Sequence, residues 1–151
     1  EILTLHPDGI LLSNGPGDPT ENQDVIAELK KLLTAKIPMF GICLGHQLLA
    51  LATGAETEKL KYGHRGANQP VRDLLSGRIY ITSQNHGYAV RCESLPKSAE
   101  LLFINLNDQS CEGIRYLDMP AFSVQFHPEA CGGPKDTDYL FDRFLNLMEQ
   151  A

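Results

Sequence analysis

The sequence lacks tryptophan altogether, and its 151 residues include only four cysteines and 7% aromatic residues. It also contains no uninterrupted apolar run of the roughly 18 to 20 residues that a membrane-spanning helix requires. The most apolar segment, 37–55, is interrupted by Pro38, three glycines, His46 and Gln47. We therefore expect no membrane association for this chain.

Basic residues are fewer than acidic ones: Lys and Arg number 13 and Asp and Glu 19, which gives a formal charge of −6. This balance argues against general nucleic-acid binding, which requires a basic face. It is typical of proteins with small-molecule or protein partners. The hydrophobic fraction of 42% is enough to build a core and excludes a disordered chain. We expect one domain spanning residues 1–151.

The four cysteines show no pattern of a metal site or a disulfide framework. No C-x-x-C pair occurs among Cys43, Cys92, Cys111 and Cys131, and no Cys/His cluster has zinc-finger spacing. Two disulfides are formally possible, but the N-terminus lacks the basic and apolar regions of a secretion signal. We expect reduced thiols in a cytoplasmic protein. Because the sequence begins with Glu1 rather than Met, we also expect it to be part of a longer chain.

The first half of the sequence alternates short apolar runs with segments of helical periodicity. The pattern predicts a strand at Ile10–Ser13 and then a helix at 20–34, which a Thr20-x-x-Gln23 capping box opens. A second strand is predicted at Pro38–Ile42, followed by a helix at 45–53 that ends at Gly54. A strand–helix–strand–helix order favours an α/β fold with a parallel sheet flanked by helices.

The second half is richer in strand signals. Residues 59–72 carry four basic and no acidic side chains, and we expect mostly loop there, with room for one strand. Ile79 and Ile81 predict a half-buried strand over 78–83, followed by a turn at 84–87 and a returning strand over 88–92. Further strands are predicted at 104–106, 111–116 and 121–126. A final amphipathic helix is predicted at 136–150, with Leu140, Phe141, Phe144, Leu145, Leu147 and Met148 facing inward.

Cys43 lies in Gly41-Ile42-Cys43-Leu44-Gly45, between a predicted strand and a predicted helix. This is the thiol form of a nucleophile elbow, in which small residues two positions away on each side permit a very tight turn. The turn strains the nucleophile's backbone and places it at a helix N-terminus, where N–H groups favour a thiolate. A buried structural cysteine is the alternative for Cys43, and the one we favour for the other three.

His127-Pro128-Glu129 supplies a base and an orienting carboxylate at the end of a predicted strand. Residues i and i+2 of an extended chain project to the same side, and Pro128 favours extended geometry at His127. His127 could then take the thiol proton while Glu129 steadies the imidazole. Taken without Cys43, the tripeptide would be an ordinary surface turn.

The remaining histidines and the first glycine-rich loop give weaker signals. We expect His46 to pack or cap its helix, His86 to have a site-shaping or structural role, and His6 and His64 to be solvated. Gly15-Pro16-Gly17 lacks the spacing of a phosphate loop. Its N–H groups could serve an oxyanion, or it is a plain strand-to-helix turn.

Together these segments resemble the class I glutamine amidotransferases, over essentially the whole chain. The resemblance is carried by 14–19 (Asn-Gly-Pro-Gly-Asp-Pro), 41–47 (Gly-Ile-Cys-Leu-Gly-His-Gln) and 127–129. Residues 41–55, 63–71 and 84–90 resemble more narrowly the carbamoyl-phosphate synthase group of that family. Relatives that make GMP, CTP or anthranilate usually differ in the middle segments.

The resemblance implies a three-layer, flavodoxin-like fold with a mostly parallel sheet, and hydrolysis of L-glutamine through a thioester on Cys43. It implies that His127 activates water, and that Gly15 and Leu44 form the oxyanion hole. Glutamine would be held by Gly17, Gln47, Asn85, Gly87 and Tyr88. The ammonia would pass to a large synthetase chain that makes carbamoyl phosphate for arginine and pyrimidine biosynthesis. ATP, magnesium and bicarbonate would bind there, so no cofactor or metal is expected on this chain.

Two departures from the family are visible. Tyr88 stands where the family usually has Phe, and the family has further strand and helix sequence before the position of Glu1. We therefore expect the sheet to lack its N-terminal strands and to leave apolar faces exposed. That sequence also supplies a serine that contacts glutamine.

Two other functions stay open. One is another class I amidotransferase or a γ-glutamyl hydrolase with the same triad. The other is a non-catalytic docking domain that uses its apolar surface and the basic segment 59–72, although a solvated loop is the interpretation that we favour for that segment.

Overall fold

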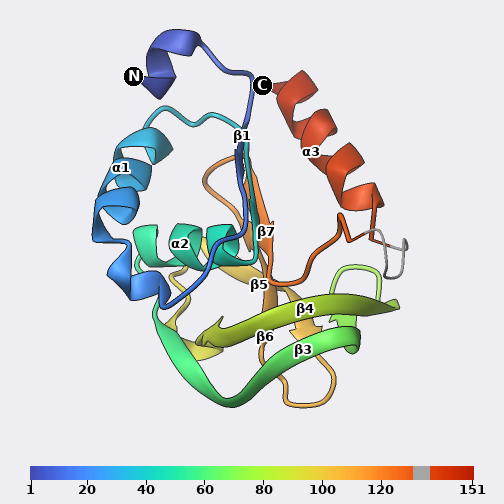
Figure 1. The fold of residues 1–151 in the computed structure, drawn as a ribbon. Helices are drawn as coiled ribbons and strands as arrows, with labels where there is room; N and C mark the ends of the chain where they lie inside the picture. The colour runs from blue at the N-terminus through green and yellow to red at the C-terminus, as the bar shows by residue number, and fades with distance from the viewer. Residues whose placement is uncertain (131–136) are drawn as a thin grey trace.

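The computed structural model describes residues 1–130 and 137–151, and it forms three layers. The described residues contain one seven-stranded sheet, in the order β1-β2-β7-β6-β5-β3-β4. Its strands are β1 (Ile10–Leu12), β2 (Met39–Ile42), β3 (Thr57–Asp73), β4 (Ile79–Val90), β5 (Ala99–Asn105), β6 (Cys111–Tyr116) and β7 (Ala121–Val124). Helices α1 (Gln23–Leu33) and α2 (Leu44–Ala52) lie on one side of it, and α3 (Tyr139–Gln150) lies on the other (Figure 1).

The sheet is mixed, which corrects the expectation of a mostly parallel one. β1 pairs with β2 and β2 with β7 in parallel, as the strand–helix–strand order predicts. The other pairings among the described strands are antiparallel, because β3 to β7 follow one another through short connections without crossover helices. The α/β class and the helices on both faces are confirmed. The nucleophile lies in the parallel part.

The two faces of the sheet carry separate apolar clusters. Leu29 of α1 and Leu49 of α2 are buried against one face. On the other face Phe40 of β2 stacks on Phe122 of β7 with ring centroids 4.4 Å apart, and Phe144 of α3 packs on the same ring. The prediction for the last helix is wrong at Leu145, which is 51% exposed because α3 turns only one stripe toward the sheet.

The longest hairpin contradicts the sequence interpretation. Residues predicted as loop lie in the 17-residue strand β3, and the predicted turn at 84–87 lies inside the 12-residue strand β4. The burial of β4 is also reversed: Ile79 and Ile81 are exposed, while Thr82, Gln84 and His86 point inward. A polar cluster between β3, β4 and β6 accounts for the reversal, since it takes the inward positions that apolar side chains usually fill.

The remaining differences are small. The capping box is wrong: Asp18 instead caps a short 3-10 helix, η2 (Pro19–Glu21), by accepting from the Thr20 N–H, and α1 follows it. Two further 3-10 helices are η1 (Ile2–Leu5) and η3 (Cys92–Ser94). Gly54 has a φ of +102° just after α2, which is the left-handed geometry expected after a helix end.

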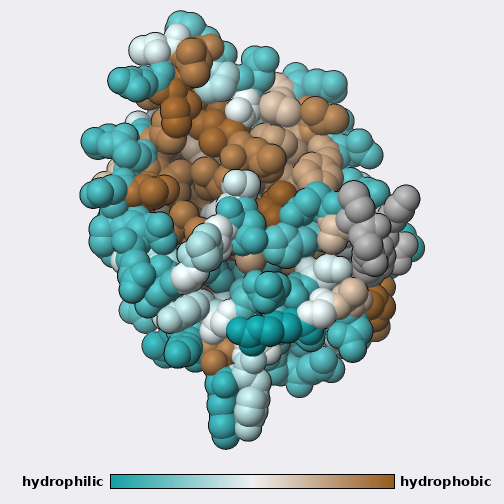
Figure 2. Space-filling model, in the orientation of Figure 1, coloured by the Kyte–Doolittle hydropathy of each residue, from teal (hydrophilic) through white to brown (hydrophobic). Residues whose placement is uncertain are grey.

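Apolar side chains gather on the surface over the N-terminal segment and β1 (Figure 2). Ile2, Leu3, Leu5 and Leu11 are between 43% and 79% exposed. β1 is also an edge strand among the described residues. The expected exposure of apolar faces is therefore present on this side. In the described residues no helix is both long and apolar enough to cross a membrane.

Candidate active site

Cys43 occupies a strained turn between β2 and α2. Its φ of 53° and ψ of −106° are unusual for a residue with a side chain. A Cβ on Gly41 would lie 2.9 Å from the carbonyl carbon of Gly45, and a Cβ on Gly45 would collide with the Leu12 carbonyl. The two glycines are therefore required by backbone contacts, as the elbow interpretation predicts. The Cys43 N–H donates to the Val124 carbonyl at 2.9 Å, which fixes the turn to β7.

His127 and Glu129 follow β7 and reach the same place. The Nδ1 atom of His127 lies 2.7 Å from a Glu129 carboxylate oxygen, so the i and i+2 side chains meet as predicted. The pKa of His127 is raised to about 10, because hydrogen bonds to the Cys43 sulfur and then to Glu129 favour the imidazolium. Burial raises the pKa of Glu129, but the hydrogen bond to His127, a backbone hydrogen bond and the positive charge of His127 together outweigh it, and the net direction is downward. The three groups can form a thiolate–imidazolium–carboxylate chain.

A cleft of about 310 Å³ opens beside Cys43 and brings the predicted substrate residues together. Its lining includes Gly15, Gly17, Leu44, Gln47, Asn85, Gly87 and Tyr88. Gly15 lies directly against Leu44, since a Cβ on Gly15 would stand 2.7 Å from Leu44 Cδ2. Leu44 begins α2, whose first N–H groups lack partners within the helix. Gly15 thus packs against the Leu44 side chain, and both residues line the cleft together with Cys43.

A chain of side-chain amides connects the cleft wall to the nucleophile. Gln47 Nε2 donates to the Tyr88 carbonyl at 2.8 Å and to Gln125 Oε1 at 2.9 Å. Gln125 Nε2 in turn donates to Cys43 Sγ at 3.6 Å. The contact to Tyr88 runs through its backbone oxygen, which is the same atom whether the residue is Tyr or Phe.

Four cleft residues were not among the predicted site residues: Pro16, Lys59, Arg65 and His86. Lys59 and Arg65 are the charged groups of the described lining, which contains no carboxylate. The cleft therefore favours a ligand that carries an anionic group. The basic run 59–72 was the available signal, but its assignment to loop hid the fact that β3 lies beside the cleft.

His64 is the one histidine whose predicted surroundings are wrong: it is only 6% exposed, and its ring contacts His86. His6 is exposed, as expected. His46 is fully buried with its Nδ1 2.7 Å from Ser123 Oγ, and burial lowers its pKa to about 3. His46 is thus a neutral packing residue, as expected.

Among the described residues, His64, His86 and Glu112 form the one group placed closely enough to share a metal ion.

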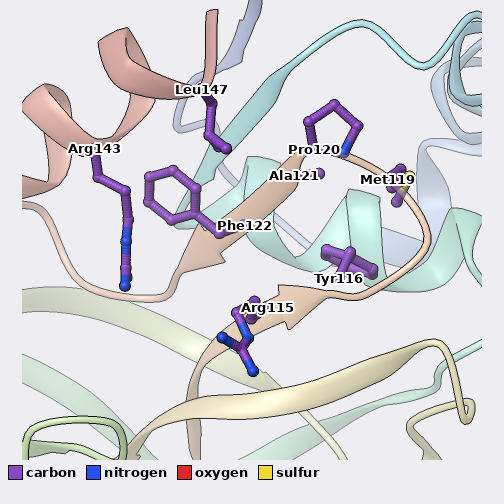
Figure 3. A pocket seen from close by; sticks show the side chains of 8 residues that line it. All are labelled: Arg115, Tyr116, Met119, Pro120, Ala121, Phe122, Arg143 and Leu147. Atoms are coloured by element: carbon purple, nitrogen blue, oxygen red, sulfur yellow. The ribbon is translucent and has the colours of Figure 1, made fainter. Parts of the chain in front are cut away.

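Neither Cys92 nor Cys111 lies in a strand-to-helix elbow. Cys92 and Cys111 are free thiols, and Cys111 is fully buried. Cys131 lies outside the described residues. Figure 3 shows a separate hollow of about 250 Å³ between α3 and the sheet, lined by Arg115, Phe122, Arg143 and Leu147 among others. Its described lining holds no thiol, imidazole or carboxylate, whereas the cleft beside Cys43 holds a thiol and the His86 imidazole.

The family model described as glutamine amidotransferase class-I matches residues 1–147. The chain belongs to this family. A carbamoyl phosphate synthase small chain from Oceanobacillus iheyensis is 62% identical over 151 residues, and the match covers 99% of this chain. One from Methanocaldococcus jannaschii is 59% identical over 150 residues and also covers 99% of this chain.

A solved structure shares the fold of this chain. A protein from Thermoplasma acidophilum, described as one of the subunits of a GMP synthase, superposes with a TM-score of 0.81 at 26% identity. The match covers 95% of this chain and 73% of that one. In contrast, this class I amidotransferase chain spans only 41% and 42% of the two small chains named above. What those whole proteins do is therefore a matter for proposal.

Proposed function

We propose that this chain hydrolyses L-glutamine to glutamate and ammonia, as the glutaminase part of a carbamoyl phosphate synthase small chain. The observation that carries the proposal is Cys43, held at a strained elbow beside the His127–Glu129 pair and facing a cleft without carboxylates. Identities of 54–62% to small chains support the choice within the family. Lys59 and Arg65 suit the α-carboxylate of the substrate.

In the first half-reaction the Cys43 thiolate attacks the side-chain amide carbon of glutamine, and a carbon–sulfur bond forms. The amide oxygen becomes an oxyanion that the N–H groups of Gly15 and Leu44 stabilise. As the tetrahedral intermediate collapses, the carbon–nitrogen bond breaks and the His127 imidazolium donates a proton to the leaving ammonia. A γ-glutamyl thioester remains on Cys43.

In the second half-reaction neutral His127 takes a proton from water, and the resulting hydroxide attacks the thioester carbon. The carbon–sulfur bond breaks, glutamate leaves, and the thiolate–imidazolium pair is restored. Glu129 stabilises the imidazolium in both halves. The substrate would be held in the cleft by Gly17, Gln47, Asn85, Gly87 and Tyr88.

We further propose that the ammonia passes to a large synthetase chain, and that ATP, magnesium and bicarbonate bind there. The matched relatives are named small chains, which supports a larger partner. They do not favour a γ-glutamyl hydrolase or a docking domain without catalysis.

The test is glutamate release by the full-length protein, with and without the large chain, from free glutamine and from poly-γ-glutamate. We expect hydrolysis of free glutamine only, stimulation by the large chain, and loss of turnover in Cys43→Ala. His127→Asn should lower kcat by a factor on the order of 10² or more. Equal turnover of poly-γ-glutamate, or full activity in Cys43→Ala, would overturn the proposal.

A further inference from the structure

A buried polar cluster lies behind the cleft wall, where the sequence alone suggested loop and turn. His64 of β3 and His86 of β4 face each other across the hairpin, with ring nitrogens 3.2 Å apart. Glu112 of β6 is fully buried, and its Oε1 lies 3.3 Å from His64 Nδ1. Gln84 bridges His86 and Glu112 with its side-chain amide. Three strands thus contribute to one hydrogen-bonded cluster.

His64 is the charged centre of this cluster. Its Nε2 lies 2.6 Å from Asp108 Oδ2, and its Nδ1 faces Glu112. Burial lowers the pKa of His64, but the hydrogen bonds and charges of Glu112 and Asp108 outweigh this and raise it to about 9. His64 is therefore an imidazolium at neutral pH, with an N–H on each ring nitrogen. Two carboxylates hold it from two sides.

His86 has the opposite character. Burial, followed by the nearby positive charges of His64, His127 and Arg65, lowers its pKa to about 4. Its Nδ1 lies 2.7 Å from the Tyr88 carbonyl oxygen, which can only accept. Its Nε2 lies 2.7 Å from Gln84 Oε1, which is also an acceptor, and 3.2 Å from His64 Nδ1. The neutral ring carries one proton and donates to one of these two oxygens. The His64 ring packs edge-on against the His86 ring, with centroids 4.9 Å apart, and so holds the orientation of His86.

The Tyr88 carbonyl is where the cluster meets the cleft. It accepts from His86 and also from Gln47, which connects through Gln125 to the Cys43 sulfur. The segment that holds this carbonyl includes Asn85 and Gly87, both of which line the cleft. A small displacement of His86 would shift the backbone of the cleft wall.

We propose that His64, held between Asp108 and Glu112, is a positioning residue that sets the glutamine-binding wall at residues 85–88 through His86. The inference rests on the proposed glutaminase function and deepens it. His64 does not line the cleft; it borders a separate hollow with Asp108 on the other side of the hairpin. Its effect therefore falls on substrate binding more than on the thiol.

The alternative occupant of the cluster is a metal ion, since His64, His86 and Glu112 converge. The structure favours a hydrogen-bonded cluster over a metal site, because both ring nitrogens of His64 and both oxygens of Glu112 already have partners in the described residues. Metal content is therefore one readout of the test.

The experiment compares His64→Asn, Asp108→Asn and the double variant in the full-length protein with its synthetase partner. His6→Asn is the matched control, since His6 is exposed and lies in no cluster among the described residues. We expect His64→Asn to raise KM for glutamine about tenfold or more, with kcat changed by less than about threefold. Asp108→Asn, at a half-exposed side chain, should give a smaller rise. The double variant should be no worse than His64→Asn, because Asp108 acts through His64.

Two labels on Cys43 separate the possible failures. Iodoacetamide needs only the thiolate, whereas an electrophilic glutamine analogue also needs the cleft. In folded His64→Asn we expect an unchanged iodoacetamide rate and weaker saturation by the analogue. Equal KM in all variants, additive effects in the double variant, or stoichiometric zinc lost on substitution would overturn the positioning role. A wild-type protein that fails to react with the analogue would instead overturn the proposed function.

Discussion

At the scale of single residues, the site depends on charge placed beside a strained thiol. Cys43 has its backbone geometry imposed by the elbow, and His127 has its pKa raised to about 10 by Cys43 and Glu129 together. The raised pKa means that the imidazolium is retained at neutral pH whenever the thiolate is present. Glu129 is the part of this arrangement that can be changed without removing either reacting group.

Glu129→Gln should therefore destabilise the thiolate–imidazolium pair while leaving its geometry. We expect iodoacetamide alkylation of Cys43 at pH 7 to slow by a factor on the order of ten, since one pKa unit corresponds to about 1.4 kcal/mol. Glu93→Gln, at a surface ion pair with Arg91, is the control. An unchanged rate at pH 7 in Glu129→Gln would contradict this role.

At the scale of elements, the turn from β2 to α2 holds the nucleophile, and its glycines are the sensitive positions. Gly41→Ala would place a Cβ 2.9 Å from the Gly45 backbone, which cannot move without moving α2. We expect a loss of about 1–3 kcal/mol in unfolding free energy and loss of Cys43 labelling by the glutamine analogue.

The control for this substitution is Gly77→Ala. Gly77 has a φ of +78° but no atom within 4 Å of a Cβ, so the change adds backbone strain without a clash. It should cost about 1 kcal/mol and leave labelling intact. Labelling lost to the same degree in both variants would show that general destabilisation, and not the elbow, is responsible.

Helix α3 offers a second test of packing, with a matched pair on the same helix. Leu140 is fully buried against the sheet, and Leu145 is 51% exposed. We expect Leu140→Ala to lower the unfolding free energy by about 2–5 kcal/mol and Leu145→Ala by about 0.5 kcal/mol or less. Denaturant unfolding measures both; similar losses would mean that the helix packs through a different face.

The elements that the sequence predicted well are those with local signals. The strands and helices around Cys43 carry apolar runs, glycine turns and helical periodicity, and their observed bounds differ from the predicted ones by a few residues at most. β3 and β4 could not be predicted in this way. The register of β3 against β4 shifts twice, and the inward side of β4 carries Gln84 and His86, so a pattern of alternating apolar residues is absent.

The same reason limits how much of the candidate site could be predicted from the sequence. Cys43, His127 and Glu129 follow from short motifs, and the cleft contains the expected substrate residues. Lys59, Arg65 and the His64 cluster lie at the site only because β3 pairs with β4 and because β4 approaches β6. Asp108 and Glu112, the partners of His64, are more than 40 residues away from it along the chain.

At the scale of the whole molecule, the buried charge of His64 links stability to pH. His64 binds its proton more tightly in the folded chain, where its pKa is about 9, than at its reference value of 6.5. Its contribution is therefore complete below about pH 6.5 and is lost as pH rises to about 9. We expect the unfolding free energy to fall across this interval.

Asp108→Asn should lower the pKa of His64, so that this loss of stability ends at a lower pH. Denaturant unfolding at a series of pH values, together with an NMR titration of the His64 ring, measures both effects. A ring that titrates at the same pH in both proteins would contradict the assignment of the charge to the Asp108–His64–Glu112 cluster.

The central claim is that Cys43 is a glutamine-directed nucleophile in an assembled cleft, and labelling with an electrophilic glutamine analogue tests it most directly. Intact mass and peptide mapping would identify the modified residue. We predict one adduct, on Cys43, that L-glutamine competes away and that Cys43→Ala abolishes. Adducts shared among the cysteines, or a Cys43 in folded protein that stays unmodified, would contradict the account.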